Sequence, residues 1–204
     1  MLTSLALLGL AVIAQTAHTA QTAQASTLNV QASDKAGKPL ADVVVAVKVA
    51  GQRNTAEAGT VFQLAQKNRQ FQPQLAVIQT GTAVNFPNFD TVRHHVYSFS
   101  PIKKFELKLY AGTPTAPVVF DQPGFAALGC NIHDGMLASV VVVDTPFFGK
   151  TDAAGKFSLE LPPGDHELLY WHNAVADNTQ WARQRIVIGN VAAQVTLTPV
   201  LAAP

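Results

Sequence analysis

The segment CNIHDGM at residues 130–136 runs directly into LASVVVV at residues 137–143. Four consecutive valines are typical of a β-strand that is buried on both of its faces. A second apolar run, AALGC, occupies residues 126–130 and leads into the same segment. Residues 130–136 are therefore predicted to form a tight loop between two strands.

Further short strands are predicted on both sides of this loop. Val, Thr, Phe, Gly and Pro recur in short runs between turn signals such as Gly81, Pro87-Asn88 and Pro162-Pro163. The chain has 204 residues, of which 48% are hydrophobic and 13% charged. That length allows one large domain or two small ones, and that composition excludes a disordered chain. We expect an all-β fold with no helix in the mature chain.

The first 25 residues differ from the rest because they contain no Asp, Glu, Lys or Arg. An apolar run at residues 5–13 is too short to span a bilayer. The sequence AQA at residues 23–25 has the A-x-A pattern of a signal-peptide cleavage site. The usual Lys or Arg near the N-terminus is missing, so either the free amine supplies the charge or the true start lies upstream. The alternative is a disordered, alanine-rich tail. We expect a signal peptide over residues 1–25, export to the periplasm, and no membrane span after cleavage.

The formal net charge of the chain is +1. This value gives no reason to expect a nucleic acid or an acidic membrane as a partner. The chain has a single cysteine, Cys130, so an internal disulfide is impossible. A lone thiol in an oxidising compartment is a liability unless it is buried or engaged. We therefore ask which group or ion engages the Cys130 thiol.

The loop at residues 130–136 offers a thiolate from Cys130, an imidazole from His133 and a thioether from Met136. Copper favours two imidazoles and a thiolate in a plane with a weak axial thioether. Zinc accepts cysteine and histidine but has little use for methionine, and calcium requires carboxylates. Each of these residues alone would be interpreted as an ordinary core or surface residue. The three together at this spacing predict a copper site.

The second imidazole is expected from the histidine pair about 35 residues earlier, His94 or His95. Successive side chains of a strand point to opposite faces, so only one of the two can point inward. His94 shares its face with two valines, Val92 and Val96, whereas His95 shares its face with an arginine and a tyrosine. The pattern favours His94 as the ligand and leaves His95 beside the site or at the surface.

The segment from residue 60 to residue 144 resembles the blue copper (cupredoxin) family of the amicyanin and plastocyanin type. The resemblance lies in QP at residues 72–73, GTAVNF at 81–86, NFD at 88–90 ahead of the histidine pair, and the Cys-x2-His-x2-Met loop. It implies a Greek-key β-sandwich with one type 1 copper ion. The copper ligands implied by position are His94, Cys130, His133 and Met136.

Two departures from the family pattern concern the surroundings of these ligands. The residue after the first ligand is commonly Asn in the family, but here it is His95. The loop histidine is followed by Asp134-Gly135 where amicyanin has proline next. The second change predicts a more polar surface around His133 and puts the usual apolar docking patch in doubt.

The flanks of this segment resemble a second small fold, the carboxypeptidase-regulatory-like β-sandwich. The motif DKAGKPLA lies at residues 34–41, and TDAAGKF at 151–157 with LPPG at 161–164 lies beyond the copper segment. We therefore expect residues 26–50 and 145–200 to build one sandwich around an inserted cupredoxin domain at 60–144. The alternative is that residues 28–49 supply the first strands of the cupredoxin itself.

The resemblance implies electron transfer in the periplasm, of the methylamine-utilisation type, with a dehydrogenase or a c-type cytochrome as redox partner. Copper delivery is the alternative function. We expect no enzymatic activity, because no nucleophile motif accompanies the remaining histidines. A basic stretch, in which Glu106 is the one opposing charge, is either a docking site for an acidic partner or an ordinary solvated face; its members are Arg93, Lys103, Lys104 and Lys108.

Overall fold

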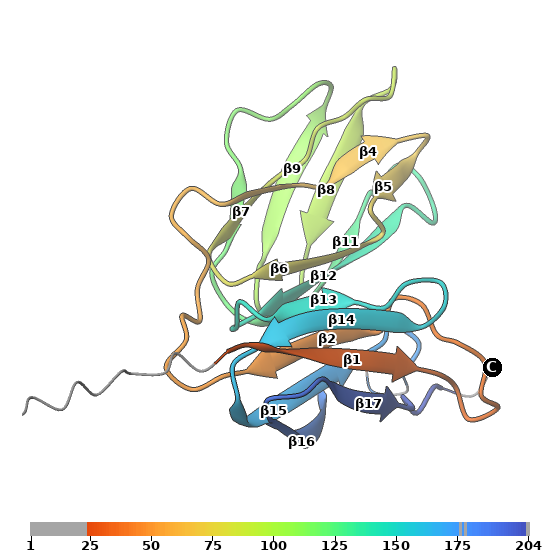
Figure 1. Ribbon diagram of the computed structural model, residues 1–204. Helices are drawn as coiled ribbons and strands as arrows, with labels where there is room; N and C mark the ends of the chain where they lie inside the picture. Colours follow the sequence, from red (N-terminus) through yellow and green to blue (C-terminus); the bar gives the residue numbers. More distant parts are fainter. Residues whose placement is uncertain (1–23, 176, 178, 203–204) are drawn as a thin grey trace, which may run out of the picture.

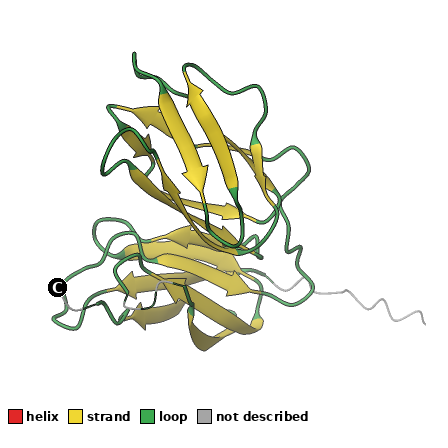
Figure 2. Cartoon of the chain, turned by 180° about the vertical axis from the view of Figure 1, so that it is seen from behind, coloured by secondary structure: helices red, strands yellow, loops and turns green. Residues whose placement is uncertain are grey.

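The computed structural model describes residues 24–175, 177 and 179–202, which form strands and loops without a helix. The prediction of an all-β fold is confirmed. Figure 1 shows two layered β structures stacked one upon the other, and Figure 2 shows the same strands from behind. Among the described residues, no helix is long and apolar enough to cross a membrane. The predicted signal peptide lies outside the described residues except for its last two positions.

The upper body in Figure 1, here called the central unit, holds residues 61–143 in two sheets and a hairpin. The larger sheet has the order β6 (Leu75–Gln79), β12 (Leu137–Val143), β11 (Gly124–Gly129), β8 (His94–Ser98) and β9 (Phe105–Tyr110). The smaller has the order β10 (Val118–Phe120), β7 (Thr82–Asn85) and β3 (Val61–Gln63). The hairpin pairs β4 (Ala65–Lys67) with β5 (Gln70–Gln72). Fully buried phenylalanines, including Phe71, Phe86 and Phe120, pack in the core of this unit.

The lower body, here called the flanking unit, holds residues 26–48 and 148–197. One sheet has the order β14 (Lys156–Leu161), β1 (Ser26–Ala32) and β17 (Ala193–Leu197). The other has the order β13 (Phe148–Lys150), β2 (Val44–Lys48), β15 (Gly164–Trp171) and β16 (Ala182–Ile188). Alternate residues of β1 are buried between the two sheets, as a two-residue side-chain period requires.

Hydrogen bonds join the N-terminal strands to the C-terminal ones. Strand β1 runs antiparallel to β14, with Val30 opposite Phe157, and parallel to β17. Strand β2 lies between β13 and β15. The chain thus starts in the flanking unit, leaves it to build the central unit, and returns.

The valine run of β12 is buried on both faces. Val140 and Val142 belong to the core of the central unit. Val141 and Val143 face the flanking unit, where they join Val44 and other residues in a third buried cluster. The outer face of the large central sheet is therefore covered by the flanking unit, and the two share an apolar core.

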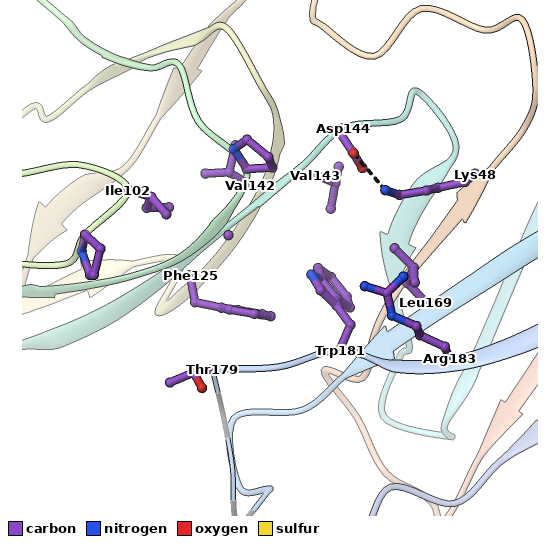
Figure 3. A pocket seen from close by; sticks show the side chains of 13 residues that line it. Lys48, Ile102, Phe125, Val142, Val143, Asp144, Leu169, Thr179, Trp181 and Arg183 are labelled. Carbon is purple, nitrogen blue, oxygen red and sulfur yellow. Dashed lines mark hydrogen bonds and ion pairs between the residues drawn. The ribbon is translucent and has the colours of Figure 1, made fainter.

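A cleft of about 440 Å³ opens beside this shared core. Figure 3 shows the rings of Phe125 and Trp181 along it, with the ion pair of Lys48 and Asp144 (2.8 Å) nearby. The ring centroids of Phe125 and Trp181 are 5.1 Å apart, and Phe125 also stacks on Trp171 at 5.0 Å. These aromatic contacts extend the junction between the two units.

Candidate metal centre

The loop at residues 130–136 connects β11 to β12, whose last pair is Gly129 opposite Leu137. The Cys130 amide donates to the Met136 carbonyl, and the Met136 amide donates to the His133 carbonyl, both at 3.2 Å. Gly135 has a φ of 79°, a left-handed conformation that glycine adopts at little cost. The loop therefore closes on itself, and its two ends, Cys130 and Met136, are buried in the core of the central unit.

Three of the four predicted ligands come together at this loop. The Nδ1 atoms of His94 and His133 are 3.1 Å apart, and the Cys130 Sγ lies 3.7 Å from the His133 Nδ1. The ligand atoms of these three residues all lie within 4.8 Å of one another. His94 and Cys130 are buried and His133 is half-buried. Met136 is buried in the same core as Cys130, and its backbone is bonded to the other two loop residues.

These donor atoms suit copper or zinc better than calcium or magnesium. Two imidazole nitrogens and a thiolate are the soft and intermediate donors that copper selects. No carboxylate belongs to the group, which argues against calcium or magnesium. Within residues 24–175, 177 and 179–202, this is the one group of three or more such side chains close enough to hold an ion.

The structure places His94, and not His95, beside the loop. His94 opens strand β8 and is fully buried on the core side with Val96. His95 points to the other face, where its Nε2 lies 2.9 Å from Glu106 and its ring packs on Tyr97 at 5.4 Å. His95 is also buried, so exposure would not have separated the two histidines. The strand's alternation does separate them.

The outer nitrogen of His94 bonds to Asp90, which entered the sequence argument only as part of the approach to His94. The Asp90 Oδ2 is 2.7 Å from the His94 Nε2. The amides of Asn68 and Arg69 donate to the two oxygens of the same carboxylate at 2.6 and 2.9 Å. Burial by itself would raise the pKa of Asp90, but these hydrogen bonds outweigh burial and hold the pKa below its ordinary value.

Tyr110 lies opposite His94 in strand β9. Its hydroxyl donates to the Phe86 carbonyl at 2.7 Å and is bonded to the Gln66 amide. Burial raises the pKa of Tyr110 to about 12, with a smaller contribution from the nearby Cys130. The Tyr110 hydroxyl is therefore neutral at physiological pH.

Exposed apolar side chains lie close in sequence to the proposed ligands. Ile132, next to His133 in the chain, is 47% exposed, Leu137 at the start of β12 is 62% exposed, and Phe89 on the loop before His94 is 64% exposed. The sequence suggested a polar surface here because of Asp134-Gly135. Asp134 and Gly135 are both exposed, but exposed apolar residues lie near them in the sequence. Sequence alone could not identify these neighbours, because an apolar residue in a strand-rich chain is normally assigned to the core.

Two residues of the basic stretch, Lys103 and Lys104, lie away from the loop. Lys103 and Lys104 precede β9, whose first residue Phe105 pairs with Ser98 at the far end of β8 from His94. The Lys103 ammonium lies 3.1 Å from the Asp121 carboxylate. Of the basic residues considered from the sequence, Arg93 is adjacent to a ligand. This placement favours the solvated-face interpretation of Lys103 and Lys104.

No family model matches the chain, and no curated protein matches its sequence. Solved structures do match. A purple cupredoxin from Nitrosopumilus maritimus has 22% identity and a TM-score of 0.35, and the match covers 41% of this chain and 98% of that one. A reduced mutant and an oxidized mutant of amicyanin each have 16% identity and a TM-score of 0.37, over 48% of this chain and 97% of theirs. Each likeness covers less than half of this chain, and the three converging side chains remain the basis for a functional proposal.

Proposed function

We propose that the chain is an exported, periplasmic electron-transfer protein of the cupredoxin type, with one type 1 copper ion. His94, Cys130 and His133 would hold the ion, and Met136 would be the weak axial ligand. The observation that carries the proposal is the convergence of two Nδ1 atoms and one thiol sulfur at a buried loop. Copper in such a ligand set supplies a one-electron couple, Cu(II)/Cu(I).

The protein's own contribution is a rigid and largely dry ligand set. His94 and Cys130 are buried, so water has little access from the core side. The loop hydrogen bonds hold Cys130, His133 and Met136 in one conformation. A centre whose ligands stay in place in both oxidation states exchanges electrons with little rearrangement. This property favours electron transfer over copper delivery, which needs a ligand set that releases its ion.

The half-buried ring of His133 offers the shortest path to the surface, and we propose that the redox partner docks over it. The exposed side chains of Ile132, Leu137 and Phe89, on segments that adjoin the ligands, would provide apolar contact area for that partner. The partner would be a dehydrogenase or a c-type cytochrome, as in methylamine utilisation. Lys103 and Lys104 would take no part, since they lie at the far end of the β8–β9 pair.

The test is reconstitution of the purified protein with one equivalent of Cu(II). We expect an intense thiolate-to-copper band in the red part of the visible spectrum, which disappears on reduction. Cys130→Ser should lose the band completely, because the thiolate is one partner in the transition. His95→Asn is the matched control and should keep the band, since His95 lies on the opposite face. A colourless copper complex of the unmodified protein would contradict the proposal.

A further inference from the structure

Both ring nitrogens of His94 are engaged, and they face different surroundings. The Nδ1 faces the Nδ1 of His133 at 3.1 Å, on the side of the loop. The Nε2 faces the Asp90 carboxylate at 2.7 Å, on the side away from the loop. A carboxylate only accepts hydrogen bonds when ionised, so the proton of a neutral His94 belongs on Nε2. That tautomer leaves the Nδ1 lone pair directed at the proposed metal position.

Asp90 is itself held in place by a turn of the backbone. Asn68 and Arg69 form the turn of the β4–β5 hairpin, and both have a positive φ, 56° and 57°. Two successive residues with positive φ characterise the type I′ hairpin turn. Their amides donate to Oδ1 and Oδ2 of Asp90, respectively. The carboxylate therefore receives two backbone hydrogen bonds in addition to that of His94.

The loop that carries Asp90 is tied down from its other side. The Asp90 amide donates to the Asn88 side-chain oxygen at 2.9 Å. The Asn88 amide group donates to the carbonyls of Val92 (2.9 Å) and Tyr110 (3.1 Å), and Asn88 is buried. The carboxylate thus has little freedom to turn away from His94.

We propose that Asp90 is a positioning residue for His94, and that the Asn68–Arg69 turn holds Asp90 in that role. The inference rests on the proposed copper function and deepens it. Asp90 selects the tautomer of His94 and orients its ring before the metal binds. Its negative charge, transmitted through the imidazole, stabilises the more highly charged Cu(II) over Cu(I) and lowers the reduction potential.

The tautomer can be measured without any metal. In the unmodified, metal-free protein, nitrogen NMR of the histidine rings should show the His94 proton on Nε2. In Asp90→Ala the Nε2 loses its acceptor, and both tautomers should be populated. A His94 proton on Nδ1 in the unmodified protein would overturn the inference, whether or not the variant folds.

The charge effect is tested by the affinities for Cu(I) and Cu(II), each measured by competition with chelators. Loss of a residue that orients a metal-bound histidine typically costs about 10- to 100-fold in affinity. For Asp90→Asn we expect the ratio of Cu(I) to Cu(II) affinity to rise about tenfold, which corresponds to about 59 mV for a one-electron couple. A ratio within twofold of the unmodified protein would contradict the inference.

Two control variants separate this effect from general ones. Asp121→Asn removes one exposed negative charge that is paired with Lys103 and has no contact with His94, so the ratio should not change. Arg69→Gly retains the backbone donor, and glycine adopts the positive φ readily, so the ratio should again not change. An equal shift in Asp121→Asn would show a long-range charge effect and would overturn the positioning role.

The outcomes also distinguish the two proposals. If the unmodified protein binds copper without a blue band, the proposed function fails. If the protein is blue, but Asp90→Ala leaves the tautomer unchanged and Asp90→Asn leaves the affinity ratio unchanged, only the inference about Asp90 fails.

Discussion

The two units of this chain use aspartate carboxylates in the same manner but for different purposes. In the flanking unit, the Oδ1 of Asp34 accepts the amides of Ala36 and Lys38, both at 2.9 Å. The Oδ1 of Asp152 accepts those of Ala154 and Lys156 at 2.9 and 2.8 Å. Each carboxylate stabilises its own turn, and its hydrogen bonds stay within four residues.

In the central unit, Asp90 accepts two amides from a different turn, more than 20 residues away. It then uses the same carboxylate to hold His94. The bond to His94 is itself local, since it spans four residues, and the two long-range bonds to the Asn68–Arg69 turn hold the carboxylate that makes it. His94 has a partner on each ring nitrogen, whereas the buried His95 and His166 each have one ring nitrogen without a partner among the described residues. His166 of the flanking unit bonds only to the Pro162 carbonyl (2.8 Å), and its Nδ1 has no partner among the described residues.

The largest effect is expected where the two units meet. Leu169 is buried in the shared core with Val141 and Val143. Leu169→Ala should lower the free energy of unfolding by about 2–5 kcal/mol, because it leaves a cavity. Chemical denaturation would measure this loss, and both units should still unfold in one transition. Val187→Ala is the control, since Val187 is 68% exposed, and it should change stability by about 0.5 kcal/mol or less. Two separate transitions in the unmodified protein would show that the units are independent.

A matched exchange of methionine and leucine compares the two cores. Met136→Leu should keep the blue colour and raise the reduction potential, because the axial ligand tunes the centre more than it binds the ion. We expect a shift on the order of tenfold in the Cu(I)/Cu(II) affinity ratio, or about 59 mV. Leu168→Met makes the reverse change in the core of the flanking unit and should leave the potential unchanged. Voltammetry of both variants measures the reduction potentials. Loss of colour in Met136→Leu would show that Met136 is required to hold the ion and does more than tune the potential.

A third experiment tests the contrast between the aspartates. Asp152→Ala should reduce the free energy of unfolding by about 1 kcal/mol, because it removes two hydrogen bonds from an exposed turn. The blue spectrum and the potential should stay the same. Asp90→Asn should change the reduction potential and should affect the free energy of unfolding less than it affects the potential. Equal changes of potential in both variants would remove the distinction between the two uses of the carboxylate.

The smallest effect concerns pH. Burial lowers the pKa of His172 below its ordinary value, although the Ala41 carbonyl and Asp42 oppose the shift. The unfolded chain therefore binds a proton at His172 more readily than the folded one. Stability should decrease as the pH falls below about 6.5. In His172→Gln this part of the decrease should be absent in denaturation curves measured between pH 7 and 5. An identical pH dependence in the variant would show that His172 does not contribute.

Much of the architecture follows from local pattern in the sequence. The alternating and continuous apolar runs predicted an all-β chain, and the four valines of residues 140–143 predicted a strand buried on both faces. The spacing of Cys130, His133 and Met136 predicted a metal-binding loop, because a loop of seven residues keeps its donors close whatever the rest of the fold does. The repeated Asp-x-x-Gly turns at residues 34–37 and 152–155 indicated a common fold for the two flanks.

Only the tertiary structure decided which residues surround that loop. His94 lies beside Cys130 because β8 pairs with β11, and no spacing rule connects residues so far apart in sequence. Asp90 and the Asn68–Arg69 turn meet through irregular backbone, whose path a periodic pattern does not encode. The lysines at residues 103–104 lie far from the loop because antiparallel pairing puts the start of β9 at the end of β8. Sequence determines what is local and periodic, and the folded chain determines which distant groups come into contact.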